Sequence, residues 1–92
     1  MINFSEYRKW QRKHPNFMTP HIIGLYKYGE LIIELSEGTG FSSDTIYGVT
    51  EVSAKGGKFK SLGGEVFTKL ADAKVYLYDK YKIYLAPYKN VP

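Results

Sequence analysis

The fold is decided by residues 21–36, which read HIIGLYKYGELIIELS. The first half of this stretch is rich in β-branched and aromatic residues, and the second half alternates apolar with polar residues. Gly29 can supply the positive φ that a tight turn between the two halves requires. Leu31, Ile33 and Leu35 would share one face of a strand. The stretch therefore predicts a β-hairpin in a sheet with one buried face.

Two further strands are expected after this hairpin. One covers Thr45–Ser53, and the next runs from Lys58 to about Leu62 after a tight turn. Gly63-Gly64 breaks or bulges the last of these strands, and residues 65–67 could extend it. Residues 83–86 alternate again, which leaves a short fifth strand open.

An amphipathic helix is predicted from about Asn3 to His14, with Asn3 as its N-cap and Pro15 ending it. Its core-facing side comprises Phe4, Tyr7, Trp10 and Gln11. The connection that follows contains Phe17 and Met18, which are expected to plug the core beneath the loop.

A second helix is predicted to start after Thr68 as its cap and to stop near Tyr81. Leu70 and Leu77 lie on its apolar face and should be buried against Ile33 of the sheet. Strands flanked by helices indicate an α+β fold, a small antiparallel sheet of four to five strands. The N-terminal and the C-terminal helix are expected to pack on one face of it, within a single domain of residues 1–92.

The composition excludes several kinds of chemistry. The chain has no cysteine, so thiolate metal sites, disulfides and cysteine nucleophiles are ruled out. It also lacks the known nucleotide, hydrolase and metalloprotease motifs, and its two histidines, His14 and His21, make a poor metal site alone. We therefore expect no catalytic residues, no metal, no cofactor and no enzymatic activity. No apolar run reaches 18 residues, which favours a cytoplasmic protein without a membrane partner.

The charges fall in three blocks. Residues 1–20 hold four Lys/Arg against one acid, residues 21–53 one lysine against five acids, and residues 54–92 eight lysines against three acids. The blocks therefore carry +3, −4 and +5. The acids of the middle block include Glu34, Glu37 and Asp44, which do not follow calcium-loop spacing and are expected to form a solvated rim. Such a rim would repel a phosphate backbone or attract a basic partner.

Two groups of residues are the candidate partner-binding sites. The outer face of the first helix is basic, and four cations on one helix face can line phosphates or steer a protein partner. Nine tyrosines exceed what one small core can absorb, and exposed tyrosines serve both protein interfaces and base stacking. The candidates are Arg8, Lys9, Arg12, Lys13, Tyr76, Tyr78 and Tyr84. A second basic cluster, Lys55, Lys58 and Lys60, would favour nucleic acid if it lay beside the first helix.

Four segments carry a resemblance to a known group of proteins. They are IYGVT at 46–50, GG at 56–57, VF at 66–67 and LADAKVY at 70–76. In this order they resemble small uncharacterised proteins of phage and prophage accessory regions, over about half of the chain. The resemblance implies a phage-type accessory protein, such as an inhibitor of a host or defence protein in the host cytoplasm, and implies no active site. The N-terminal helix has no counterpart in it.

The sequence thus predicts a small non-enzymatic binding protein that occupies a surface of another macromolecule. A host or defence protein is the favoured partner. A nucleic-acid-binding module that uses the basic helix face is the alternative, and a minor structural protein that self-associates through its tyrosines is a third interpretation.

Overall fold

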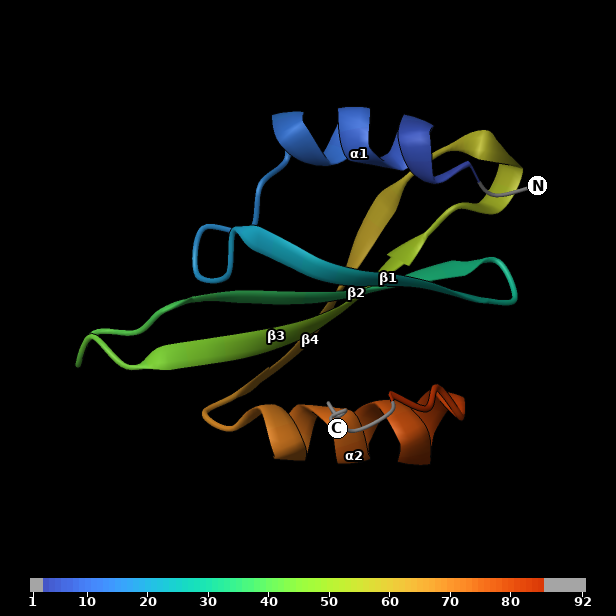
Figure 1. Ribbon diagram of the computed structural model, residues 1–92. Helices are drawn as coiled ribbons and strands as arrows, with labels where there is room; N and C mark the ends of the chain where they lie inside the picture. The colour runs from blue at the N-terminus through green and yellow to red at the C-terminus, as the bar shows by residue number, and fades with distance from the viewer. Residues whose placement is uncertain (1–2, 86–92) are drawn as a thin grey trace.

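The computed structural model describes residues 3–85. Four strands form one antiparallel sheet in the order β1-β2-β3-β4 (Figure 1). They are β1 (His21–Tyr28), β2 (Leu31–Thr39), β3 (Thr45–Ser53) and β4 (Lys60–Phe67). Gly29 takes a φ of 62° between β1 and β2, as the hairpin prediction requires. A single 3₁₀ turn, η1 (Lys55–Gly57), joins β3 to β4. The α+β class and the antiparallel meander are confirmed.

The last strand begins two residues later than predicted and takes the bulged, extended form that the sequence left open. β4 continues through Gly63-Gly64 to Phe67, and its pairing with β3 shifts register between Glu51 and Val52. Gly63 has a φ of 101°, which is open to glycine, so the strand bends there without ending. Residues 83–85 are not in a strand, and residue 86 of the expected fifth strand lies outside the described residues.

The two helices, α1 (Phe4–Lys13) and α2 (Leu70–Tyr81), lie on opposite faces of the sheet (Figure 1). The expectation that both pack on one face is wrong. β2 alternates as predicted, but its Ile32 face is covered by α1 while its Ile33 face is covered by α2. Both residues are fully buried, so the central strand has no solvent face. The aromatic stripe of α1 has to be buried somewhere, and the second sheet face is the surface left for it.

Each helix covers a separate hydrophobic core on its own face of the sheet. On the α2 side, Ile33, Leu35 and Val49 pack against Ala73, Leu77 and Tyr81. The predicted burial of Leu77 and Ile33 is confirmed, and Leu70 is partly buried beside them. On the α1 side, the buried residues are Tyr7, Ile32 and Val52, with Trp10 and Phe59 partly buried around them. Neither helix within residues 3–85 has the length and apolar character that crossing a bilayer demands.

The helix ends follow local rules with one exception. The side chain of Asn3 accepts hydrogen bonds from the backbone N–H groups of Ser5 and Glu6, which confirms it as the N-cap of α1. The predicted cap Thr68 is wrong, because Lys69 holds the N-cap position of α2 and makes no side-chain cap. The prediction that α2 stops at Tyr81 is confirmed.

The connection between α1 and β1 also corrects the sequence analysis. Phe17 and Met18 do not plug the core; they are 88% and 54% exposed. Thr19 is buried in their place and accepts a hydrogen bond of 2.8 Å from the Ser36 hydroxyl. The loop backbone sits so close to Gly38 that a Cβ there would lie 2.0 Å from the Met18 carbonyl oxygen. This close contact between the loop and the sheet fixes the loop backbone and leaves the Phe17 ring outside the core.

Candidate functional site

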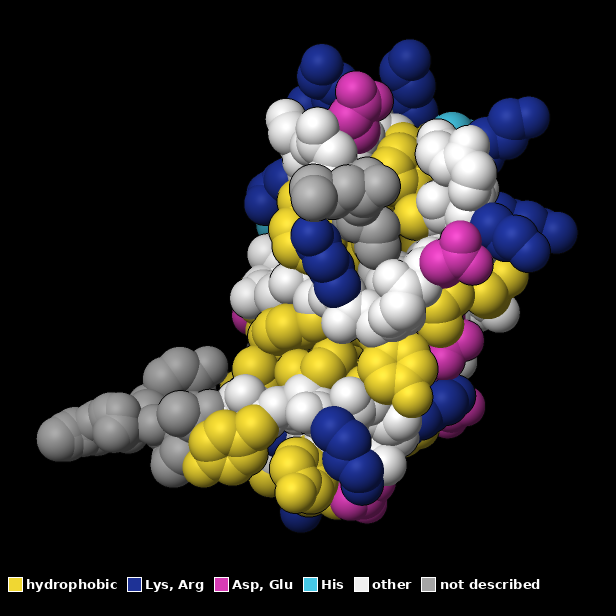
Figure 2. Space-filling model, turned by 90° about the vertical axis from the view of Figure 1, so that its right-hand side faces the viewer, with side chains coloured by type: hydrophobic (Ala, Val, Ile, Leu, Met, Phe, Trp, Pro, Cys, Tyr) yellow, Lys and Arg dark blue, Asp and Glu magenta, His cyan; other side chains and the backbone are white. Residues whose placement is uncertain are grey.

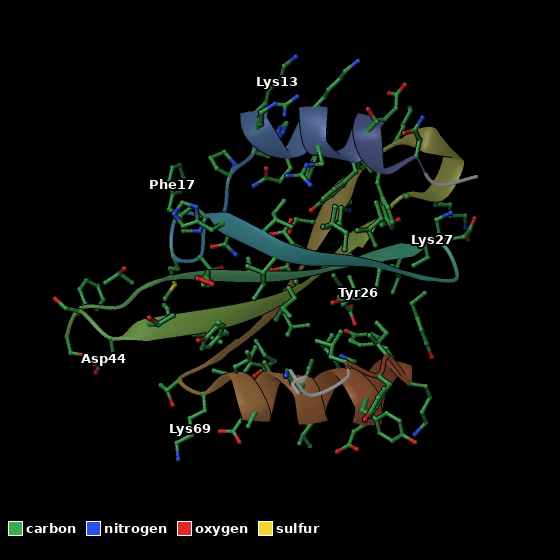
Figure 3. All side chains as sticks on the ribbon, in the orientation of Figure 1. Lys13, Phe17, Tyr26, Lys27, Asp44 and Lys69 are labelled. Carbon is green, nitrogen blue, oxygen red and sulfur yellow. The ribbon has the colours of Figure 1, made fainter. Side chains whose placement is uncertain are left out.

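The basic face of α1 is exposed as predicted. Arg8, Lys9, Arg12 and Lys13 all face solvent. None of the four cations of α1 forms a salt bridge with a carboxylate of residues 3–85. Figure 3 shows Lys13 pointing away from the sheet at the end of α1 near which Phe17 lies.

The second basic cluster lies beside this helix. Lys58 and Lys60 are exposed, and Phe59 between them packs against α1, with its ring centroid 5.5 Å from that of Tyr7 and 5.8 Å from that of Trp10. Lys60 of β4 and Lys13 of α1 line the same pocket. Figure 2 shows Lys and Arg side chains gathered about the α1 end of the molecule. Lys13 and Lys60 therefore join the two basic clusters at one pocket, the placement that adds weight to nucleic acid as a partner.

The pocket between α1 and the sheet has a volume of about 610 Å³. We call it the α1–β4 pocket. Aromatic rings form much of its wall. They come from Tyr7, Trp10, Phe17 and Phe59. His14, also in the wall, stacks on Trp10 at 4.5 Å between centroids, and its Nδ1 lies 3.0 Å from the Trp10 carbonyl oxygen. The helix C-terminus thus holds two stacked rings at the pocket wall.

Two polar side chains are buried at the same pocket. Glu34 is 3% exposed, and its Oε1 accepts a hydrogen bond from the Tyr7 hydroxyl. Burial raises the pKa of Glu34, and the Tyr7 hydrogen bond opposes that rise. Burial and the neighbouring carboxylate together raise the pKa of Tyr7. Gln11 is 9% exposed and its side chain has no hydrogen-bond partner among residues 3–85.

The expected solvated acidic rim is wrong at Glu34, since α1 covers that position. Glu37 is half-buried, and Asp44 is exposed and accepts a hydrogen bond from Ser42. No group of three or more His, Asp or Glu residues in the described part of the chain is arranged to hold a metal ion. His14 is in the aromatic stack, and His21 opens β1.

The three candidate tyrosines lie on the other side of the sheet, so the structure does not bring them together with the basic face. Tyr78 and Tyr84 are 49% and 70% exposed, and their rings meet edge to face at 6.5 Å. Tyr76 is half-buried, packs on Phe67 and accepts a hydrogen bond of 3.2 Å from Lys80.

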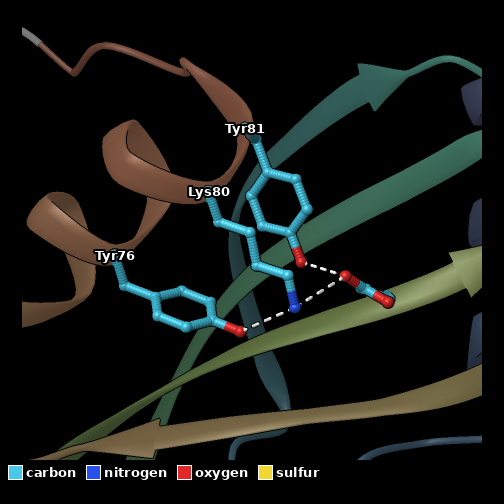
Figure 4. Close-up of polar contacts among 4 residues, drawn as sticks. Tyr76, Lys80 and Tyr81 are labelled. Carbon is cyan, nitrogen blue, oxygen red and sulfur yellow. Dashed lines mark hydrogen bonds and ion pairs between the residues drawn. The ribbon is translucent and has the colours of Figure 1, made fainter.

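A small polar network occupies the α2 side. Glu51 of β3 accepts a hydrogen bond from the Tyr81 hydroxyl and pairs with Lys80 at 3.2 Å (Figure 4). The Tyr81 hydrogen bond, aided by Lys80, lowers the pKa of Glu51. This network ties α2 to the sheet, so Tyr76 and Lys80 have a structural role.

Sequence reasoning named Lys60 in the second basic cluster but did not assign four other lining residues of the pocket to a site. They are Gln11, Phe17, Glu34 and Phe59. A signal was present in the apolar stripe of α1, which needs a partner surface, and in the polar side chains on the second face of β2. Comparison with known proteins found no matching family model, no matching curated protein and no matching solved structure.

Proposed function

We propose that this protein is a non-enzymatic, cytoplasmic binding protein that engages single-stranded nucleic acid at the α1–β4 pocket. One observation carries the proposal: Lys13 and Lys60, from different elements, both line a pocket that is also walled by aromatic rings. Lysines attract the phosphate backbone, and aromatic rings stack on unpaired bases.

The pocket has a size that suits this role. Its volume of about 610 Å³ lies within the range of small-ligand sites, roughly 300–1,000 Å³. Phe17 is exposed at the pocket on a loop that is pinned to the sheet, so its ring is presented without a large ordering cost. A duplex keeps its bases stacked inside, so a pocket of this kind favours a single strand.

The acidic middle block of the chain counts against nucleic acid, because it would repel a phosphate backbone. One of its five acids is removed from the basic surface by the fold, since Glu51 is paired with Lys80 and Tyr81 on the α2 side. Glu34 lines the pocket but is 3% exposed, and its Oε1 accepts a hydrogen bond from Tyr7. The repulsion expected from a continuous acidic surface is therefore reduced, which supports nucleic acid as the ligand.

The test is fluorescence anisotropy with a labelled single-stranded 12-mer at 50 and 200 mM salt. If four Lys or Arg side chains of this surface contact phosphates, the slope of log affinity against log salt concentration is about −2.8. The affinity then falls roughly 50-fold between 50 and 200 mM salt. Replacing Lys13 and Lys60 with glutamine removes two contacts and should halve the slope. The matched control replaces Lys69 and Lys82, two exposed lysines of the α2 side, and should leave the slope unchanged.

An affinity that does not change with salt concentration, or an equal loss of affinity in both double variants, would contradict binding at the α1–β4 pocket. Failure to bind any single strand at 50 mM salt would reject the proposed function as a whole.

A protein partner is a second candidate, favoured by the opposite face. Val75, Tyr78 and Tyr84 are exposed large side chains gathered around α2, at 58%, 49% and 70%. A host or defence protein docked there would fit a phage-type inhibitor, with the tyrosines as anchors. Tyr78→Ala should then raise the dissociation rate from a protein captured by pull-down, while Lys60→Gln, on the other face, should not. Equal dissociation rates for wild type and Tyr78→Ala would remove this candidate.

A further inference from the structure

The α1–β4 pocket holds more hydrogen-bonding capacity than the protein itself uses. Glu34 has a recorded partner, Tyr7, at Oε1 only, and the Gln11 amide has none within residues 3–85. Both side chains are more than nine-tenths buried. Buried polar groups are nearly always paired, because an unpaired one loses its water without compensation. Two such groups lining one pocket indicate a ligand whose polar edge pairs with them.

The chemistry of the two groups defines that edge. An ionised carboxylate only accepts hydrogen bonds, and it can accept two side by side. A primary amide can donate one next to it. The complementary ligand carries two adjacent donors beside one acceptor, on a flat ring that fits between aromatic side chains.

Among the nucleobases, guanine has this edge. Its N1–H and its N2 amino group are adjacent donors, and its O6 is the neighbouring acceptor. Extending the proposed function, on which this inference rests, we propose that the α1–β4 pocket selects an unpaired guanine of a single strand. Glu34 accepts from N1–H and the N2 amino group, and Gln11 donates to O6.

The other bases do not match the hydrogen-bonding groups of Glu34 and Gln11. Adenine and cytosine present one amino donor beside a ring nitrogen that is an acceptor, which would face the carboxylate. Thymine and uracil present one N–H between two carbonyl oxygens, so the carboxylate would meet an acceptor on either side. Each of these leaves an uncompensated polar group in a buried site, and that is the strongest source of discrimination in recognition.

The remaining residues of the pocket suit a nucleotide in a strand. Trp10 and Phe59 supply flat apolar surface against which a base can stack, and Phe17 stands exposed where the neighbouring base would lie. Lys13 and Lys60 provide charge for the flanking phosphates.

The experiment compares thymine 12-mers that carry one central guanine, adenine, cytosine or hypoxanthine, by anisotropy at 100 mM salt. Hypoxanthine keeps N1–H and O6 of guanine but lacks the N2 amino group. We expect the guanine strand to bind about 5- to 150-fold more tightly than the adenine strand, the discrimination of one bidentate base contact. The hypoxanthine strand should fall between them.

Glu34→Gln should reduce the affinity for the guanine strand to that for the adenine strand. Glu37→Gln is the matched control on the same strand β2, outside the pocket, and should keep the preference. Gln11→Met preserves side-chain length and removes the amide, and it should weaken guanine binding by less than Glu34→Gln. It also serves if Glu34→Gln fails to fold.

The outcomes separate the two proposals. Equal affinity for all four strands, or a guanine preference that survives both Glu34→Gln and Gln11→Met, overturns the guanine site while strand binding still stands. No binding to any strand overturns the proposed function itself. Guanosine monophosphate as a free ligand distinguishes the source: tight binding of the mononucleotide alone, with no gain from the strand, would show a free-nucleotide site and contradict a role in strands.

Discussion

The hydrogen bond from Tyr7 to Glu34 ties α1 to the centre of the sheet, and Tyr7→Phe tests its contribution. Both residues are buried, at 1% and 3% exposed. The substitution removes one hydroxyl and leaves the ring packed between Trp10 and Phe59. It therefore deprives the Glu34 carboxyl of the one hydrogen bond that the structure records for it.

The size of the effect depends on the charge of Glu34. Burial raises the pKa of Glu34 in the folded state above its ordinary value near 4.5. The contribution of Glu34 to stability is therefore fully present below pH 4.5 and is lost as the pH rises through the folded-state pKa. Tyr7→Phe raises that pKa further, because the hydrogen bond had lowered it. We expect a loss of about 1.5–3 kcal/mol at pH 8, where the bond is to a charged group, and about 0.5–1.5 kcal/mol at pH 4.

Urea unfolding at pH 4 and pH 8 measures both values, with the wild type under each condition as reference. Tyr28→Phe is the control, since Tyr28 is 46% exposed, and should change stability by no more than about 0.5 kcal/mol. An equal loss at the two pH values, or no loss at pH 8, would refute the reasoning that Glu34 ionises while buried beneath Tyr7.

Leu77→Ala removes a fully buried side chain and should lower the free energy of unfolding by about 2–5 kcal/mol in urea melts; a loss below 0.5 kcal/mol would place Leu77 outside the core. The free energy of unfolding of Glu34→Gln, relative to wild type, should rise from pH 4 to pH 8, because the folded-state pKa of Glu34 is raised. That of Glu51→Gln should fall over the same range, because the folded-state pKa of Glu51 is lowered. Slopes of the same sign in pH-dependent melts would contradict these assignments. Phe17→Ala should leave stability within about 0.5 kcal/mol and weaken single-strand binding by about 1–3 kcal/mol in anisotropy titrations, and unchanged affinity would remove Phe17 from the site.

The elements of this fold were predictable because their signals are local. The run of β-branched and aromatic residues before Gly29 and the alternation after it produce the hairpin, and the Asn3 side chain caps α1. The spacing of the apolar residues of α2 likewise identifies Leu77 as buried. Each of these patterns depends on neighbours within a few residues along the chain.

The placement of the helices was not predictable from the same signals. The alternation in β2 indicates an apolar face and a more polar face, but it does not indicate that α1 covers the polar face. Sequence reasoning therefore places Glu34 in solvent. Its burial follows from the Tyr7 hydroxyl, 27 positions away, which gives the carboxylate a partner. Phe17 was expected inside because it is apolar, yet the loop is seated by Thr19 and Gly38, which leaves the ring outside.

The site itself depends on contacts between distant segments. Lys13 and Lys60 lie 47 positions apart and meet at one pocket because Phe59 packs against α1. The cation clusters were visible in the sequence, but the pairing that joins them is set by the register of β3 and β4.

Trp10 offers the most direct measurement of the central claim, since it is the single tryptophan of the chain and lines the α1–β4 pocket. Its fluorescence should be quenched as a guanine-containing single strand is added, in step with the anisotropy of the labelled strand. The quenching should require a higher strand concentration when Lys13 and Lys60 are replaced by glutamine, and should be unchanged when Lys69 and Lys82 are replaced. A strand that binds by anisotropy without changing the Trp10 emission would show that the nucleic acid lies elsewhere, and that result would contradict the account.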